Sequence, residues 1–231
     1  MKRSDIAKKA LKLTLPVLTG YMVLGMGFGI LLTSSGFEGI LAVMMSIFIY
    51  AGSMQFAAVG LLTSGASILT SGLTTLMVNA RHIFYGISMM EKYKDTGRYK
   101  PYLIFALTDE TYSLLCMDDP EITKKDKGFY YFLVSLFDQL YWVMGTVLGV
   151  VIGSLISFST EGIDFSLTAL FVTIFLDQWL GKKGRVPAVI GVGVSVICLA
   201  VFGSEHFLIP AMLVIALMLC LYKEKEVKNN D

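Results

Sequence analysis

Charged side chains are scarce in this sequence. Asp, Glu, Lys and Arg make up 16% of its 231 residues, whereas hydrophobic residues make up 55%. A water-soluble domain usually carries about 25% charged residues. Four long stretches carry none of these charges: Leu13 to Phe37, Gly39 to Ala80, Gln139 to Thr160 and Val186 to Ser204. Because about 20 apolar residues cross a bilayer as a helix, the sequence predicts an all-α, polytopic integral membrane bundle.

Residues that bind metals and cofactors are also scarce. The chain has two histidines and three cysteines, and Cys116, Cys198 and Cys220 lie in apolar segments without metal-ligand spacing. We therefore expect no metal site, disulfide or cofactor. The string GMGFG follows no strand, so it does not predict a dinucleotide loop. A net charge of +1 gives no general attraction to nucleic acid.

The basic residues indicate how the chain is oriented. Eighteen of the nineteen Lys and Arg residues fall in five clusters, at Lys2–Lys12, Lys92–Lys100, Lys124–Lys127, Lys182–Arg185 and Lys223–Lys228. The segments 33–38, 159–164 and 204–206 carry acid and no base. The positive-inside rule therefore places the amino terminus in the cytoplasm, and we expect it to begin the first retained helix rather than a signal peptide.

The membrane spans are predicted near 14–32, 39–62, 66–90, 130–157, 165–181, 186–203 and 207–222. Segment 101–118 is ambiguous, because Asp109 and Glu110 lie at its middle and basic loops flank it. The acidic turn at Glu38 and the basic cluster at Lys92 should lie on opposite sides of the membrane, so the chain should cross an odd number of times between them. The length of the segment, however, suggests two crossings. We expect a discontinuous helix between Gly65 and Gly86 to resolve this conflict.

The two halves of the chain share short matching segments. YMVLGMGFG at 21–29 matches YWVMGTVLG at 141–149, and EGI at 38–40 matches EGI at 161–163. We expect one transporter domain over 1–231, with repeat halves 13–90 and 130–222 joined by 91–129. Duplicated bundles are typical of secondary transporters, which place the substrate between the repeats. The glycine pairs in the first match are expected to allow close helix packing.

The nineteenth basic residue, Arg81, lies inside an apolar stretch with His82 beside it. An arginine at the centre of a membrane helix costs about 2.5–3.5 kcal/mol on the insertion scale. If 79–86 is helical, Asn79 shares a face with His82, and Arg81 shares a face with Tyr85. Arg81, with Asn79 and Tyr85, is therefore a candidate for binding a carboxylate, and His82 for exchanging a proton. The alternative is that Arg81 only forms a structural ion pair with Asp109 or Glu110, or reaches the membrane interface.

Further polar residues interrupt the apolar stretches. Asp109 and Glu110 are candidates for binding a proton or an ammonium group, or they lie in a solvated loop. Gly52, Ser53 and Gln55 suit a broken-helix substrate site, or they serve only in hydrogen bonding between helices. Asp138 and Gln139 rank lower, because Asp138 is expected near the interface.

The motifs YAGSMQF, VNARHIFYG, TDETYSL and YWVMGTVLG resemble the AzlC family of branched-chain amino acid exporters over essentially the whole chain. The resemblance implies export of leucine, isoleucine or valine, and sometimes methionine, across the cell membrane. It also implies coupling to the proton gradient and a small membrane subunit of the AzlD type. An oligomer is compatible with it.

Two other functions compete with this expectation. A membrane-embedded enzyme would use His82, Asp109 and Glu110 as acid-base or metal groups, although the chain lacks zinc-site spacing. A scaffold subunit would leave the transport path to its partner. We expect a transporter and no enzyme.

Overall fold

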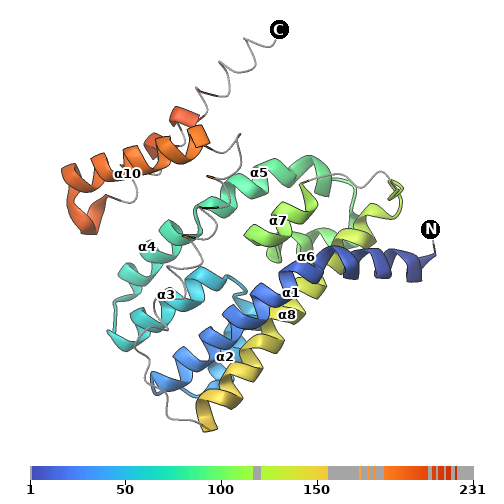
Figure 1. Cartoon of the computed structure of the whole chain (residues 1–231), viewed down its shortest axis with the longest axis horizontal. Coiled ribbons are helices and arrows are strands. Elements are labelled where there is room, and N and C mark those ends of the chain that lie inside the picture. The colour runs from blue at the N-terminus through green and yellow to red at the C-terminus, as the bar shows by residue number, and fades with distance from the viewer. Residues whose placement is uncertain are drawn as a thin grey trace. The chain divides into compact units, whose positions relative to one another are not determined.

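A computed structural model describes residues 2–116, 121–155 and 185–207 (Figure 1). It also describes residues 172, 176, 179, 210–211, 213–215, 217–219 and 222. No β-strand occurs among the described residues, and three of their helices are long and apolar enough to cross a membrane: Arg3–Ser34, Lys127–Leu155 and Arg185–Gly203. The predicted all-α membrane fold is confirmed. The predicted span at 165–181 falls largely outside the described residues, and the one at 207–222 is described only in part. The second EGI match, the acidic turn at 159–164, Cys220 and Lys223–Lys228 lie wholly outside them.

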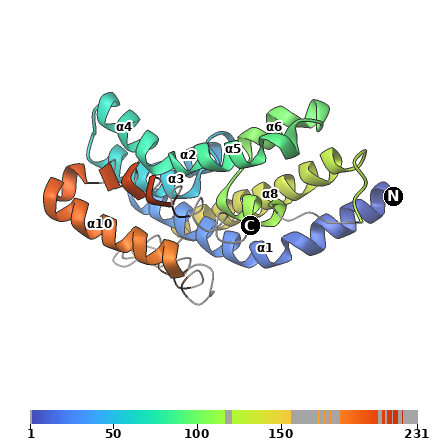
Figure 2. The same ribbon diagram turned by 90° about the horizontal axis from the view of Figure 1, so that it is seen from above.

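The chain divides into two compact units, Met1–Ser166 and Leu167–Asp231. Helices α1 (Arg3–Ser34) and α8 (Lys127–Leu155) run side by side in the first unit (Figures 1 and 2). Gly25 lies against the backbone of Trp142 and Thr146, and Gly29 against that of Thr146 and Val150. Positions further along α1 therefore meet positions further along α8, so the two helices are parallel.

The glycines of the two matching segments form this contact from both sides. A Cβ atom on Gly145 would lie 2.7 Å from the carbonyl oxygen of Met22. Gly149 is equally constrained by the backbone of Met26. The predicted packing role of both glycine pairs is confirmed. The duplication itself stays a prediction, but the longer pair of matching segments, 21–29 and 141–149, is in contact.

Helices α2 (Gly39–Phe48) and α3 (Gly52–Thr63) form a hairpin. The start of α2 lies beside Val150 of α8. Ile47, near the end of α2, accepts a hydrogen bond from Gln139, which comes earlier in α8. Helix α2 therefore runs antiparallel to α8, toward the centre. The chain reverses at 49–51, where Tyr50 has a positive φ of 45°. Phe56 then packs on Phe28, so α3 runs back toward the end where α2 began.

The next segment crosses in two pieces. Helix α4 (Ile68–Asn79) packs beside α3, and α5 (Arg81–Tyr93) continues past the centre. The helical hydrogen bonds tighten around Ala80, whose amide bonds to Met77 and whose carbonyl accepts from Ile83, both three residues away. The predicted discontinuity between Gly65 and Gly86 is confirmed. The premise of one uninterrupted helix over 79–86 is wrong.

A second hairpin enters from the opposite end. After the short helix η1 (Gly97–Tyr99), α6 (Lys100–Phe105) follows α8 inward, with Tyr102 bonded to Gln139. The chain turns at 106–108. Helix α7 (Asp109–Leu115) then runs back, so that Lys92 near the end of α5 donates to the carbonyls of Leu115 and Cys116.

These two hairpins resolve the conflict over the number of crossings. A helix of 10 or 12 residues is about 15–18 Å long, which is roughly half of a hydrocarbon core of about 30 Å. The crossing predicted at 39–62 is therefore wrong, because α2 and α3 enter and leave on one side. Between Glu38 and Lys92, only α4 with α5 runs from one end of the α1–α8 pair toward the other, whereas α6 and α7 run inward and return to the end where they began.

Basic residues gather at the end where α1 and α8 begin. Lys9 pairs with Glu121 at 2.5 Å, and Arg3 lies over the ring of Phe129. Beneath them is a buried cluster to which α1, α5, α6, α7 and α8 all contribute: Ile6, Ala10, Met89, Tyr93, Leu103, Leu107, Leu115, Ile122, Tyr130, Tyr131 and Val134. We call this the basic end, and the opposite end, with the turns at 34–38 and 64–67, the acidic end.

Helix α10 (Arg185–His206) belongs to the second unit. Its described core consists of Val194, Cys198 and Ala211. Gly203, with a φ of 73°, bends the backbone near its end. This places the predicted span 186–203 on a single helix that stops at the bend.

The hairpins predict an unusual labelling pattern. Ser34→Cys and Ser64→Cys, each placed in a cysteine-free background, should react with a membrane-impermeant thiol reagent from the same side, and Asp95→Cys from the other side. The reason is that α2 and α3 return to the acidic end, whereas α5 leads to the basic end. Labelling of positions 34 and 64 from opposite sides would contradict the α2–α3 hairpin.

The glycine contact predicts a selective loss of stability. Gly29→Ala places a methyl group 2.4 Å from the carbonyl oxygen of Thr146, so it should lower the unfolding temperature in detergent, with a cost of about 1–3 kcal/mol. Gly20→Ala on the same helix meets no atom within 4 Å and gains helix propensity, so it should be neutral or stabilising. Equal effects of the two changes would argue against the backbone contact.

Candidate functional site

The interruptions of three elements meet near the middle of the first unit. They lie at 49–51 between α2 and α3, at Ala80 between α4 and α5, and at 106–108 between α6 and α7. The rings of Tyr50 and Phe105 lie 6.3 Å apart, which joins the tips of the two hairpins. Interrupted helices expose backbone groups and bring several elements to one point, as transporter substrate sites require.

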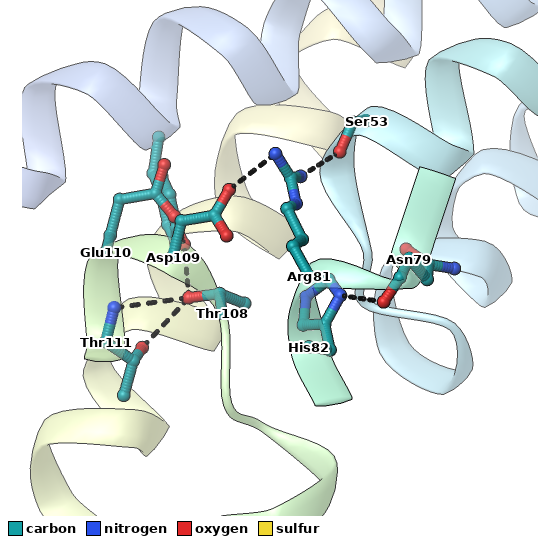
Figure 3. Close-up of polar contacts among 9 residues, drawn as sticks. Ser53, Asn79, Arg81, His82, Thr108, Asp109, Glu110 and Thr111 are labelled. Carbon is teal, nitrogen blue, oxygen red and sulfur yellow. Dashed lines mark hydrogen bonds and ion pairs between the residues drawn. The ribbon is translucent and has the colours of Figure 1, made fainter. Parts of the chain in front are cut away.

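Arg81, the first residue of α5, connects the two hairpins (Figure 3). Its Nη1 lies 3.0 Å from Oδ2 of Asp109, the first residue of α7. Its Nη2 donates to the hydroxyl of Ser53 in α3. The side chains of Arg81 and Asp109 are 27% and 23% exposed, so the pair is largely enclosed. The structural pairing that the sequence left open therefore exists, and it lies at the centre of the unit.

Three further candidates lie around this ion pair. Nδ1 of His82 lies 3.2 Å from the backbone carbonyl of Asn79, across the interruption at Ala80. The ring of Tyr85 stacks on Tyr112 of α7, with centroids 4.6 Å apart, and meets the edge of His82. Arg81, His82, Asn79 and Tyr85 are thus brought together, although Asn79 belongs to α4 and the others to α5.

The candidates in α3 divide between two roles. Ser53 contacts Arg81, as described above. Gln55 is fully buried, donates to Ser46 and accepts from the indole of Trp142, each at 3.0 Å. Gly52 packs against the ring of Trp142, which leaves no room for a side chain. Gln55 and Gly52 therefore fit the alternative of interhelical packing.

Glu110 bonds to α1 rather than to Arg81 and enters a chain of hydrogen bonds. The hydroxyl of Tyr21 donates to Glu110 Oε2 at 2.6 Å and lies 2.8 Å from the hydroxyl of Thr108. Thr108 donates to Thr111 at 3.1 Å, and Thr111 donates to Asp138 Oδ2 at 2.7 Å. The chain links two carboxyl groups on different helices, and Figure 3 shows its Thr108–Thr111 step.

Asp138 and Gln139 lie deeper than the sequence indicated. Asp138 has no exposed surface and sits near the middle of α8, so its expected place near the interface is wrong. Gln139 donates to the carbonyl of Ile47 at 3.0 Å and accepts from Tyr102 at 2.6 Å. It joins α8 to both hairpins.

Several important residues carry no clear signal in the sequence. Tyr21, Thr111 and Trp142 are neutral residues within apolar segments. Thr108 is the exception, because the TDET string is typical of a helix start, and its hydroxyl does accept from the Thr111 amide.

A cavity of about 810 Å³ opens beside the interruptions. Asn79 and His82 line it at the centre, and Lys94 and Lys100 line it toward the basic end. Its walls between these points are mainly apolar, with Ile83 and Ile104 among them. A cavity of this size and character suits a small amphiphilic molecule.

No three His, Cys, Asp or Glu side chains within the described part of the chain are placed to hold a metal ion. The polar centre consists of the Arg81–Asp109 ion pair, neutral hydrogen-bonding groups and the carboxyl groups of Glu110 and Asp138.

Comparison with known proteins identifies the class of this protein. The sequence pattern described as "AzlC protein" matches residues 16–156. A relative from Bacillus subtilis, described as a branched-chain amino acid transport protein AzlC, is 44% identical over 93% of this chain and 85% of its own length. A Helicobacter pylori membrane protein is 39% identical over 94% of this chain and 95% of its own length. An Escherichia coli inner membrane protein, YgaZ, is 27% identical over 74% of this chain and 72% of its own length.

No solved structure matches this chain. The apolar helices and the matched family together define an integral membrane transport protein. The chain belongs to the AzlC family.

The ion pair predicts energetic coupling between α5 and α7. In a double-mutant cycle with Arg81→Met and Asp109→Asn, the double variant should unfold at a higher temperature than additive effects allow, because each single change leaves one charge without this partner. We expect a coupling of about 1–3 kcal/mol. The matched cycle with Lys9→Met and Glu121→Gln, where Glu121 is 71% exposed, should give less than about 1 kcal/mol. Additive effects at Arg81 and Asp109 would show that the pair does not join the hairpins.

Proposed function

We propose that this protein is a secondary transporter that exports branched-chain and related neutral amino acids across the prokaryotic cell membrane, driven by the proton gradient. The observation that carries the proposal is the cavity that reaches from the basic end to the meeting point of the interrupted helices, where an enclosed arginine lies. The Bacillus subtilis relative, described as a branched-chain amino acid transport protein, supports the substrate class.

The chemistry of the cavity fits an amino acid with an aliphatic side chain. Ile83, Met90, Ile104 and Leu107 offer apolar surface for that side chain. Asn79 and His82 line the inner end of the cavity. Arg81 lies between them in the sequence and has five N–H donors. The substrate carboxylate takes the place of Asp109 on the guanidinium, and the freed Asp109 accepts the ammonium group.

The roles of the surrounding residues follow from this exchange. Ser53 holds the guanidinium while its ionic partner changes. His82, which lines the cavity, and the carboxyl groups of Asp109 and Glu110 bind the coupling proton. Asn79 and Tyr85 complete the polar inner wall, whereas Gln55 and Gly52 set the position of α3. Only the exchange at Arg81 joins substrate binding to the contact between the hairpins.

The orientation and the partner belong to the same proposal. The basic end faces the cytoplasm under the positive-inside rule, so the amino terminus and the mouth of the cavity lie on that side. Export therefore starts with substrate entering a cavity that is open in this structure. A small AzlD-type membrane subunit completes the transporter.

Replacement of Arg81 tests this function. The protein should be reconstituted in liposomes with and without the small subunit, and efflux of labelled leucine measured under a pH gradient. Arg81→Leu should lower the rate at least tenfold, because the carboxylate loses its ionic partner. The matched change Arg98→Leu, at an exposed position of the basic end, should leave the rate within twofold. Efflux from Arg81→Leu at the normal rate would disprove the proposed site, and no efflux from either wild-type preparation would disprove the function.

A further inference from the structure

The hydrogen-bonded chain between Glu110 and Asp138 contains more contacts than its hydroxyl groups have hydrogens. The chain has four contacts, all between 2.6 and 3.1 Å, in the order Glu110, Tyr21, Thr108, Thr111 and Asp138. A hydrogen bond needs one hydrogen between its two oxygens. Each hydroxyl group supplies one hydrogen, so the three hydroxyl groups supply three.

If both carboxyl groups are ionised, one contact is left without a hydrogen. When Tyr21 donates to Glu110 and Thr108 donates to Thr111, no hydrogen remains for the 2.8 Å contact between Tyr21 and Thr108. Two hydroxyl oxygens that close would then repel each other. Any other assignment of donors only moves the gap to another contact.

One added proton completes the chain in either of two ways. If Glu110 carries it, each group donates to the next until Thr111 donates to Asp138. If Asp138 carries it, every hydrogen bond reverses and Tyr21 donates to Glu110. The two states differ only in the direction of donation, so the same oxygen positions accommodate both.

The surroundings of the chain disfavour two negative charges. Asp138, Thr111 and Thr108 are buried, and Asp138 takes part in neither of the described ion pairs, Arg81–Asp109 and Lys9–Glu121. The other titratable groups near Asp138 are the hydroxyls of Tyr50 and Tyr102, which are neutral near pH 7. An ionised carboxylate without a cation is costly in such a place.

We propose that Glu110 and Asp138 share one proton through Tyr21, Thr108 and Thr111, and that this pair of carboxyl groups is a proton-binding site. Its role in transport rests on the proposed function. The chain leads from Glu110, next to the ion pair with Arg81, to Asp138 on α8. A proton that moves along it enters at one carboxyl and leaves from the other, and each hydroxyl passes on one hydrogen and receives another.

Infrared spectroscopy at pH 7 tests the shared proton without any transport. The full-length protein in lipid should show the carbonyl band of a buried, protonated carboxyl group. Glu110→Gln and Asp138→Asn should each abolish this band, because the new amide N–H group supplies the missing fourth hydrogen and lets the remaining carboxyl ionise. Asp126→Asn, at a partly exposed residue that accepts from Thr123, is the matched control and should keep the band.

The outcomes of this measurement separate clearly. Loss of the band in both variants, with unfolding temperatures close to that of the wild type, supports the shared site. A band that survives in either variant shows a proton fixed on one residue, and its absence from the wild type shows that no proton is stored; both results overturn the inference. If one variant does not fold, the band of the other decides.

A transport measurement tests the role of the site. Asp138→Asn should lose the leucine gradient driven by a pH difference but keep leucine exchange at equal pH within about twofold. Loss of both activities in a folded variant, or retention of both, would overturn the coupling role. A wild-type protein that moves no leucine would disprove the proposed function and leave the infrared result to decide the proton site.

Discussion

The structure depends on the placement of one permanent positive charge among interrupted helices. Arg81 begins the inner half of a crossing segment, and it is bound to Asp109 at the tip of one hairpin and to Ser53 near the tip of the other. Without these partners a guanidinium at this depth would be costly to insert. With them, α5 and the tips of the two hairpins are held at a single point, beside the cavity.

The chemistry around this point separates into two systems. One is ionic and includes Arg81 and Asp109, which lie next to the cavity. The other consists of the two carboxyl groups, Glu110 and Asp138, and the hydroxyl groups between them. Asp109 and Glu110 are adjacent in sequence, yet they belong to different systems because neighbouring residues on a helix point about 100° apart. A change in the partner of Arg81 frees Asp109, which is the residue next to Glu110 at the start of the hydrogen-bonded chain.

The sequence predicted the features that depend on charge and composition. The all-α membrane fold, the close glycine packing, the interruption near Ala80 and an ionic partner for Arg81 all follow from apolar length or from the cost of a buried charge. It did not predict that α2 and α3 turn back, because Gly52, Ser53 and Gln55 indicate a broken helix but give no sign that the chain reverses there. There, buried polar contacts among Ser46, Gln55, Trp142 and Thr146 hold the hairpin together. The reversal falls at Tyr50 in a left-handed conformation, which is uncommon for a residue other than glycine and carries no sequence signal.

The parallel contact of α1 and α8 has a mechanical consequence. Their backbones touch through glycines that face each other, so any tilting of one helix against the other would open an empty seam or drive main-chain atoms together. These two helices therefore behave as a fixed frame. The half-length helices are attached to that frame by short turns and by side-chain contacts, so any movement that opens the centre has to take place in the hairpins rather than between α1 and α8.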